Sequence, residues 1–169
     1  MTVFVSRGPS QTKKLAKRIL VSRLKAASRP AILALRGELG SGKTTFIQGL
    51  ARALGIREKI QSPTFVIMKW YVLPRRFQSF RHLVHLDAYR LERAKEAKHL
   101  GLDHIFQDPD AIIVVEWAER IKRLIPKSAY WIKFQHGEKP HERIIQLRIQ
   151  MPKFKMQEAA VGSNENFSF

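Results

Sequence analysis

The chain has 169 residues, of which 44% are hydrophobic, and this size and composition suit one domain with a substantial core. It contains no cysteine, which excludes a disulfide scaffold, a thiolate zinc site and a cysteine nucleophile. Lys and Arg number 31 against 14 Asp and Glu, giving a formal charge of +17 that attracts polyanions.

The positive charge is concentrated at the start of the chain. Residues 1–37 hold nine Lys or Arg and no acidic residue, since the first acid is Glu38. This pattern indicates either contact with RNA or a general basicity that only favours solubility, because charge alone confers affinity without specificity. The first residues are too polar for a signal-peptide core, and no apolar run reaches the roughly 18 residues of a membrane span. We therefore expect a cytoplasmic protein.

Hydrophobic patterning predicts strands and helices in turn along the chain. Residues 31–36 and 111–117 are nearly continuous apolar runs, as expected of strands that are buried on both faces. The β-rich segments 62–73 and 80–89 are expected to pair as a hairpin. The full set of expected strands is 2–6, 31–36, 62–73, 80–89, 111–117, 130–136 and 142–150, and helices are expected at 11–27, 43–54, 91–106 and 118–124.

Local signals suggest where some of these elements begin and end. Ser10 is expected to cap the first helix, Gly55 to end the second, and Gly101 to interrupt the third. No internal linker or repeat is visible, so residues 1–151 are predicted to form a single domain. Residues 152–169 lack hydrophobic periodicity and are predicted to form a disordered tail.

The segment Gly37–Thr45, GELGSGKTT, matches the phosphate-binding pattern G-x-x-x-x-G-K-[ST]. Glycines let backbone N–H groups converge on phosphate oxygens, and the helix that follows adds its positive N-terminal end. A buried strand before the segment and an amphipathic helix after it are the context that the motif requires. Lys43 is expected to reach the β- and γ-phosphates of a nucleotide, and the Thr44 hydroxyl to bind Mg²⁺.

Two carboxylates end neighbouring apolar runs and are candidates for the acidic residue of such a site. Glu116 ends IIVVE, the arrangement of a Walker B strand, and Asp87 ends HLVHLD. Carboxylates at strand ends are often solvated caps, but a phosphate-binding loop upstream favours a functional role for both. Glu116 is the better metal candidate, and Asp87 is expected to face the γ-phosphate and the attacking water. Which of the two is the principal catalytic acid stays open.

Other polar and aromatic positions allow two interpretations each. The segment 62–64 (SPT) is either a loop that senses the γ-phosphate or an ordinary turn before a strand. Trp117 is either a core residue or a stacking surface near the nucleotide. Three of the histidines, His82, His85 and His99, show no spacing or acidic partner typical of a metal site, so they are expected to be surface or strand residues.

Together these motifs resemble the TsaE (YjeE) family, the P-loop ATPases of bacterial tRNA threonylcarbamoyladenosine synthesis. The matching segments are GELGSGKTTFIQGLARALGI, SPTF, HLDAYRL, LGLDHIF and VVEWAER, in that order, and PSQTKKLA is similar to the Ser-x-Thr opening of the family's first helix. The resemblance covers about residues 8–150. Ala118 stands where the family often has proline, and the connection VLPRRFQSFR is longer and more basic than expected. These departures leave the partner surface and any direct tRNA contact open.

The resemblance implies a three-layer α/β/α P-loop NTPase fold with a mixed, mostly parallel sheet. It also implies an ATPase with ATP and Mg²⁺ as cofactors, weak alone and activated by partners. In the family, TsaC makes a threonylcarbamoyl-adenylate, and TsaD with TsaB transfers the group to tRNA. Hydrolysis of ATP by TsaE supports turnover of the TsaD–TsaB machine.

The resemblance further assigns roles to residues of this chain. Lys43, Asp87 and Glu116 are expected to carry catalysis, and Thr44 with Glu116 to hold Mg²⁺. Thr12 is expected near the adenine end of ATP, Asp87 against the nucleotide, and Glu119 close to it, while SPTF is similar to the family's switch region. The loop residues expected around the phosphates are Leu39, Gly40, Ser41, Gly42, Lys43 and Thr44.

Two other classes of function remain as alternatives. A small nucleoside or nucleotide kinase would fit the size and the loop, although no Arg-rich lid follows Glu116; phosphorylation of any acceptor by radiolabelled ATP would favour it. A nucleotide-gated module that binds RNA or a partner protein would fit the basic N-terminal segment; titration of tRNA against salt would test it. A GTPase is disfavoured because no Asn-Lys-x-Asp motif occurs.

Overall fold

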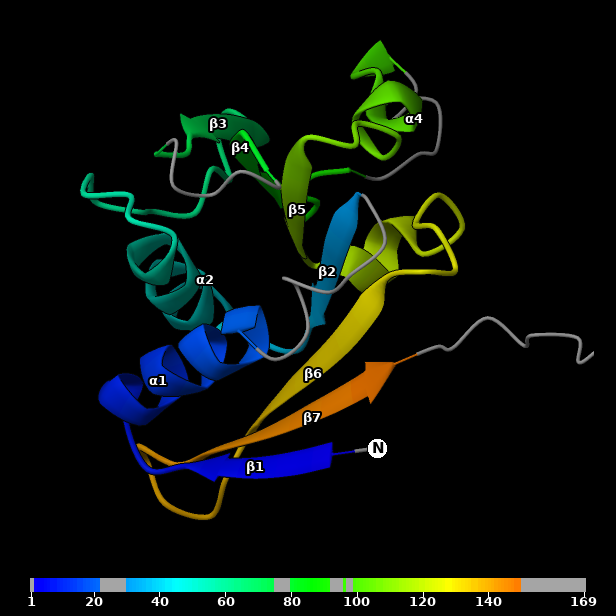
Figure 1. The fold of residues 1–169 in the computed structure, drawn as a ribbon. Coiled ribbons are helices and arrows are strands. Elements are labelled where there is room, and N and C mark those ends of the chain that lie inside the picture. Colours follow the sequence, from blue (N-terminus) through cyan, green and yellow to red (C-terminus); the bar gives the residue numbers. More distant parts are fainter. Residues whose placement is uncertain (1, 22–29, 75–79, 92–95, 97–98, 150–169) are drawn as a thin grey trace, which may run out of the picture.

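The computed structural model describes residues 2–21, 30–74, 80–91, 96 and 99–149 (Figure 1). The expected tail at residues 152–169 lies outside the described residues, as do residues 22–27 of the first predicted helix and most of residues 92–98 of the third. None of the helices in the described ranges is long and apolar enough to cross a membrane, since the longest have 11 residues.

Seven strands form one mixed sheet in the order β1-β7-β6-β2-β5-β4-β3. The strands are β1 (Thr2–Ser6), β2 (Ala31–Arg36), β3 (Met68–Val72), β4 (His82–Asp87), β5 (Ala111–Glu116), β6 (Tyr130–His136) and β7 (Arg143–Ile149). The pairings β6–β2, β2–β5 and β5–β4 are parallel, and the other three are antiparallel. The sheet is therefore mixed, as predicted, and its parallel part is confined to the centre.

Helices cover both faces of this sheet, which gives the predicted three layers (Figure 1). The longer helices α1 (Pro9–Ile19) and α2 (Lys43–Ala53) lie together on one face, and the short helix α4 (Leu102–Ile105) and the 3-10 helix η2 (Ala118–Ile121) lie on the other. Alternate residues of β2 divide between the two cores. Leu33 and Leu35 pack on the side of α1 and α2, whereas Ile32 and Ala34 pack on the side of α4 and η2.

Two helix boundaries differ from the predictions. Helix α1 begins at Pro9 with Gly8 as its N-cap, so the expected cap at Ser10 is wrong. Proline suits the first helical position because that position needs no N–H donor. Of the third expected helix, residues 96 and 99 are helical, residues 100 and 101 form a turn, and α4 begins at Leu102 with Gly101 as its N-cap, so the expected interruption near Gly101 is confirmed. The 3-10 helix η2 ends at Ile121, earlier than the expected residue 124.

The strand expected at residues 62–73 is also wrong in its first half, because β3 begins only at Met68. The carbonyl of Pro63 accepts the N–H groups of Val66 and Ile67 at 3.0 and 2.6 Å, which closes a turn. Ile67 has a φ of 65°, which lies outside the β region and is rare for a β-branched residue. The predicted hairpin is nevertheless confirmed, since β3 and β4 pair in antiparallel orientation.

Gly49 allows α2 to lie directly against α1. A Cβ atom at this position would lie 2.5 Å from Lys13 Cα and 2.8 Å from the Lys13 carbonyl oxygen, and these backbone atoms cannot swing aside. We expect Gly49→Ala to lower the free energy of unfolding by about 1–3 kcal/mol through overpacking, although alanine alone favours a helix by about 1 kcal/mol. Urea unfolding would measure the change. Gly8→Ala, whose Cβ would meet no atom within 4 Å, is the matched control, and equal stability of both variants would contradict this packing.

Candidate functional site

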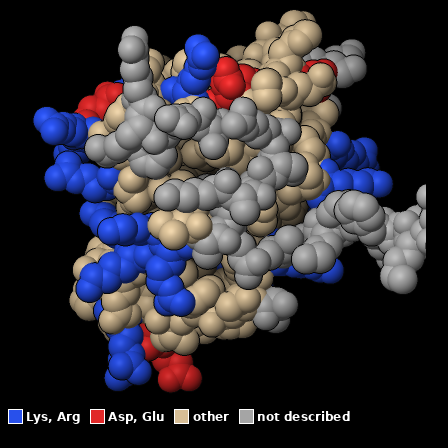
Figure 2. All heavy atoms as spheres, in the orientation of Figure 1, with Lys and Arg blue, Asp and Glu red and all other residues tan. Residues whose placement is uncertain are grey.

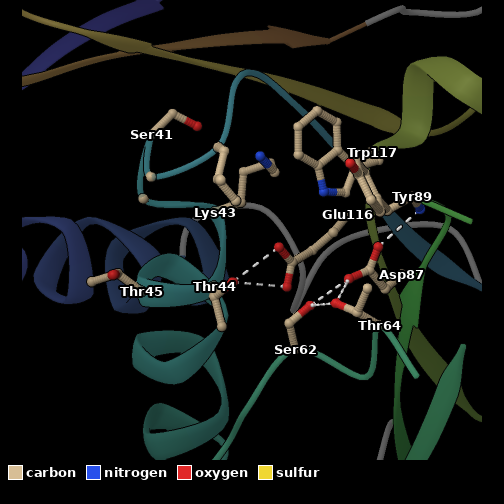
Figure 3. A pocket seen from close by; sticks show the side chains of 13 residues that line it. Ser41, Lys43, Thr44, Thr45, Ser62, Thr64, Asp87, Tyr89, Glu116 and Trp117 are labelled. Carbon is tan, nitrogen blue, oxygen red and sulfur yellow. Dashed lines mark hydrogen bonds between the residues drawn. The ribbon is translucent and has the colours of Figure 1, made fainter. Parts of the chain in front are cut away.

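The central parallel strands place their carboxyl ends at one edge of the sheet, where a cavity of about 450 Å³ opens (Figure 3). Strand β2 leads into the glycine-rich loop and α2, and β4 and β5 end side by side, with Asp87 paired in register with Glu116. This is the edge at which open α/β sheets bind ligands. The cavity is lined by Leu39, Gly40, Ser41, Gly42, Lys43, Thr44, Thr45, Ser62, Thr64, Asp87, Tyr89, Glu116 and Trp117.

Glycine is required in the loop for two separate reasons. At Gly37 a Cβ atom would lie 2.2 Å from the carbonyl oxygen of Phe134, so no side chain fits there. Gly42 has a φ of 99° and is the N-cap of α2. The first N–H groups of α2 have no partner within the helix and lie at the cavity, where they form an anion-binding terminus.

Lys43 is buried and folded back onto its own loop. Its Nζ donates hydrogen bonds to the carbonyl oxygens of Gly37 and Glu38 at 2.6 and 2.8 Å, and lies 3.9 Å from the centroid of the Trp117 ring. Burial lowers the pKa of Lys43 below its usual value, and the nearby carboxylates, Glu116 foremost, oppose that change only in part. The ammonium group therefore lacks a full counter-charge at the site where phosphate oxygens would supply one.

Thr44 and Glu116 meet at the base of the cavity, as Figure 3 shows. The Thr44 hydroxyl lies 3.0 Å from each carboxylate oxygen of Glu116, to which it donates. A hydroxyl and a carboxylate are oxygen ligands of the kind that Mg²⁺ prefers. Among the described residues no three His, Cys, Asp or Glu side chains gather as a metal site. A Mg²⁺ ion held here would depend on phosphate oxygens and water for its remaining ligands.

His85, on β4, contacts the Glu116 carboxylate and was not predicted as a site residue. Its Nε2 lies 2.9 Å from Glu116 Oε1, the His85 side chain is fully buried, and its Nδ1 has no partner among the described residues. Because a carboxylate only accepts hydrogen bonds, Nε2 carries the hydrogen that is shared with Glu116. The signal was available in the sequence: His85 lies two residues before Asp87 in a strand, so the two side chains share one face.

We expect His85→Leu to weaken Mg²⁺-dependent nucleotide binding about tenfold, because the loss of a charge-assisted hydrogen bond of about 1.5 kcal/mol frees the Glu116 carboxylate to turn. His85→Gln keeps an N–H donor near the position of Nε2 and is expected to retain most of the affinity. Titration of a fluorescent ATP analogue at several Mg²⁺ concentrations would measure both variants. Equal loss in both, or loss that persists without Mg²⁺, would contradict this role.

Asp87 is tied to the segment that follows α2. Its Oδ2 accepts hydrogen bonds from the Ser62 and Thr64 hydroxyls, the latter at 2.7 Å, and its Oδ1 accepts the Tyr89 N–H at 2.9 Å. Segment 62–64 leads into the turn that begins at Pro63, and Ser62 and Thr64 also line the cavity, so a role of this segment toward a bound phosphate stays a prediction. Figure 3 shows the two hydroxyls directed at the carboxylate.

The structure does not bring every predicted residue to the cavity. Thr12 is buried on α1, where its hydroxyl lies 2.8 Å from Ser6 Oγ, and it does not line the cavity. Glu119 lies outside the lining but accepts the N–H of Gly37 at 3.4 Å, at the base of the loop. Trp117 lines the cavity in a left-handed conformation, with its ring 5.1 Å from that of Tyr89, a cavity residue that was not predicted.

Comparison with known proteins gives consistent matches. The family model described as threonylcarbamoyl adenosine biosynthesis protein TsaE matches residues 6–145. The chain is 42% identical to the tRNA threonylcarbamoyladenosine biosynthesis protein TsaE of Bacillus subtilis over 125 residues, 71% of this chain and 68% of that protein. It is 46% identical over 89 residues to the protein of the same name from Streptomyces coelicolor, 52% of this chain and 57% of that protein.

A solved structure is similar to this chain in both fold and sequence. The crystal structure of Bacillus subtilis YdiB superposes with a TM-score of 0.70 at 30% identity, and the match covers 89% of this chain and 86% of that one. The family model spans most of the chain, and the loop, the two acids and the SPTF segment lie within the matched range. The chain therefore belongs to the TsaE family, the P-loop proteins of tRNA threonylcarbamoyladenosine biosynthesis.

Proposed function

We propose that this chain is the ATP-hydrolysing subunit of the tRNA N6-threonylcarbamoyladenosine synthesis machinery and that it acts with TsaD and TsaB. The observation that carries the proposal is the meeting of Lys43, Thr44 and Glu116 at one cavity, behind a glycine-rich loop and a helix N-terminus. Family membership supports the pathway. The tRNA substrate of this pathway is cytoplasmic, so the proposal includes a cytoplasmic location.

In this proposal the loop binds the phosphates of ATP. Backbone N–H groups from Leu39 to Thr44 surround the β- and γ-phosphates, and Lys43 exchanges the carbonyls of Gly37 and Glu38 for phosphate oxygens. Each of these contacts strengthens as negative charge moves onto the β–γ bridge, and once ATP is bound the groups are in position before the reaction. Trp117 and Tyr89 form the aromatic wall of the same cavity.

Thr44 and Glu116 are the residues that would hold Mg²⁺, which offsets charge between the β- and γ-phosphates when it is bound. Their mutual contact and the support from His85 fix the direction of the Glu116 carboxylate. Asp87 lies beside Glu116 at the end of the neighbouring strand, and in this proposal it faces the γ-phosphate. It is held by three hydrogen bonds from the turn and the backbone, so the direction in which it would orient the attacking water depends on the position of the turn.

The switch region gives a physical reason for activation by partners. Ser62 and Thr64 are bonded to Asp87, and the next two residues, Phe65 and Val66, are 83% and 68% exposed. A protein that covers these apolar side chains would shift the turn and with it the hydrogen bonds to Asp87. Hydrolysis by the chain alone is therefore expected to be slow.

ATP hydrolysis by the chain alone, and together with TsaD and TsaB, is the experiment that tests the proposal. We expect TsaD and TsaB to stimulate ATP hydrolysis, and we expect no transfer of labelled phosphate to nucleosides or nucleotides. Fast turnover that is indifferent to the pair would leave the nucleotide site in place and remove its assignment to this machine. Transfer of radiolabelled phosphate to an acceptor would instead favour a kinase.

A further inference from the structure

A second surface, separate from the nucleotide cavity, is both concave and basic. This surface, which we call the basic groove, runs along α1 and around the C-terminal end of α2. It is defined by six exposed cations: Lys13, Lys14, Lys17, Arg52, Arg57 and Lys59. Three neighbouring hollows form the groove. The middle hollow shares Lys13 and Arg52 with the hollow along α1, and it shares Arg52 and Arg57 with the hollow at the end of α2. None of its lining residues lines the nucleotide cavity.

The basic groove has almost no negative charge within it. Helices α1 and α2 contain no Asp or Glu, and no ion pair joins any of the six cations to an acidic residue in the described part of the chain. Glu58 is the one acid that lines the groove, and it is paired with Lys69 at 3.2 Å. Figure 2 shows the resulting concentration of Lys and Arg over α1.

The arrangement of these charges works against the stability of the helix that carries them. Lys13, Lys14 and Lys17 follow the i, i+1, i+4 spacing of one helix face, where like charges repel. The helix dipole accounts for Lys17 and Arg52, which lie in the last turns of their helices, but not for Lys13 and Lys14. Solubility requires charge but does not require that it line a groove.

We infer that the basic groove is a docking surface for the phosphate backbone of a folded RNA. The inference extends the proposed function, from which it takes only the choice of tRNA as the RNA. Exposed Lys and Arg side chains on a concave, rigid pair of helices can neutralise several phosphates at once and release their counterions. Contacts of this type position an RNA without reading its sequence.

Two features favour RNA over an anionic membrane. The large exposed apolar side chains of the described residues lie on β1 and β3, at residues 65 and 66, in the glycine-rich loop, and just after α1 and β4. None of them lines the basic groove. A surface that inserts into a bilayer combines its cations with such side chains. The family is named for a tRNA modification, so an RNA is the polyanion that this chain encounters in its pathway.

The test measures binding of an end-labelled, unmodified tRNA transcript to the full chain by fluorescence anisotropy at several salt concentrations. We expect the triple variant Lys13→Gln, Lys14→Gln, Lys17→Gln to bind about tenfold or more weakly, with a slope of log K against log salt that is shallower by roughly 2 to 3. The matched control removes three exposed cations on the η2 side: Lys122→Gln, Arg123→Gln and Lys127→Gln. It is expected to retain wild-type affinity within about threefold.

Additional measurements separate this inference from a folding defect and from the proposed function. Thermal unfolding of the groove variant should be unchanged or shifted upward, since like-charge repulsion is relieved, and binding of a fluorescent ATP analogue should be unchanged. Equal losses in both triple variants, an unchanged affinity and slope in the groove variant, or no tRNA binding at low salt would overturn the inference. Loss of binding to TsaD–TsaB or to anionic vesicles instead of tRNA would overturn it too.

Discussion

Replacing Lys43 with methionine is expected to lower the rate of ATP hydrolysis by about 10²- to 10³-fold, because one preorganised charge is removed from the β–γ bridge. The methionine retains the unbranched stem against Trp117 but cannot neutralise phosphate charge. Steady-state release of phosphate, with TsaD and TsaB present, would measure the effect. Lys122→Met, an exposed lysine outside the site, is the control, and full activity of the Lys43 variant would refute the assignment of the loop.

The same substitution is expected to leave the free energy of unfolding of the ATP-free protein unchanged or higher. Burial lowers the pKa of Lys43 below 10.5, so the unfolded chain binds this proton more tightly than the folded chain does. Between the lowered pKa and 10.5, Lys43 makes the free energy of unfolding rise with pH. At every pH below that range, the buried charge of Lys43 lowers the free energy of unfolding. If the Lys43→Met variant loses activity and keeps its stability, the defect lies in ATP hydrolysis and not in folding.

This pKa also predicts how ATP binding depends on pH. Phosphate contact requires the ammonium form of Lys43, which is lost at a lower pH than in an exposed lysine. Affinity for ATP is therefore expected to fall as the pH rises through the lowered pKa, and the fall should be absent from the Lys43→Met variant. An identical alkaline profile in both proteins would assign the effect to another group.

Replacing Glu116 with glutamine is expected to lower Mg²⁺-dependent hydrolysis by about 10²- to 10³-fold, since the carboxylate that faces Thr44 loses its charge. Glutamine keeps the shape of the side chain and one oxygen that accepts from His85, so the fold should persist. Binding of ATP in the presence of EDTA should change less than threefold, which separates a metal defect from a binding defect.

Single-turnover rates at increasing Mg²⁺ concentration would test this metal role. The wild-type rate should saturate with Mg²⁺, whereas that of the Glu116 variant should stay low at every concentration. Glu138→Gln, an exposed acid in the turn between β6 and β7, is the matched control. An unchanged Mg²⁺ dependence in the Glu116 variant would move the metal to Asp87, and a parallel series on Asp87→Asn would then separate the two acids.

The parts of the site that were predictable depend on local sequence. The runs 31–35 and 111–115 are apolar throughout because both faces of a central strand are buried, and each leads directly into a functional residue or loop. The glycine spacing of the loop reflects backbone positions that exclude side chains, so it can be recognised from the sequence without a structure. The tie between Asp87 and segment 62–64 is different, because it requires the position of a turn 23 to 25 residues away in the chain.

What could not be predicted depends on contacts between distant segments. The run TFVIM has strong strand propensity, yet its first residues form a turn, in which the Pro63 carbonyl accepts two N–H groups and the Thr64 hydroxyl is bonded to the distant Asp87. The spacing of His85 from Asp87 places both side chains on one face, but the contact of His85 with Glu116 depends on the register of β4 against β5, which the apolar pattern does not specify. Thr12 was assigned by resemblance alone, and its place near the adenine stays a prediction; in the structure its hydroxyl joins α1 to β1 through Ser6.

The sheet ends on both sides in a five-residue strand, β1 at one border and β3 at the other. Each is paired on one side only within the described residues, and each bears exposed apolar side chains: Val3 and Val5 on β1, and Trp70 and Val72 on β3. Such borders can recruit the same strand from another molecule. The charge of +17 keeps two molecules apart at low ionic strength, and salt screens that repulsion within about 10 Å at 0.1 M. The surplus of Lys and Arg thus also protects the colloidal stability of the protein, and concentrated salt would promote self-association through its open β-borders.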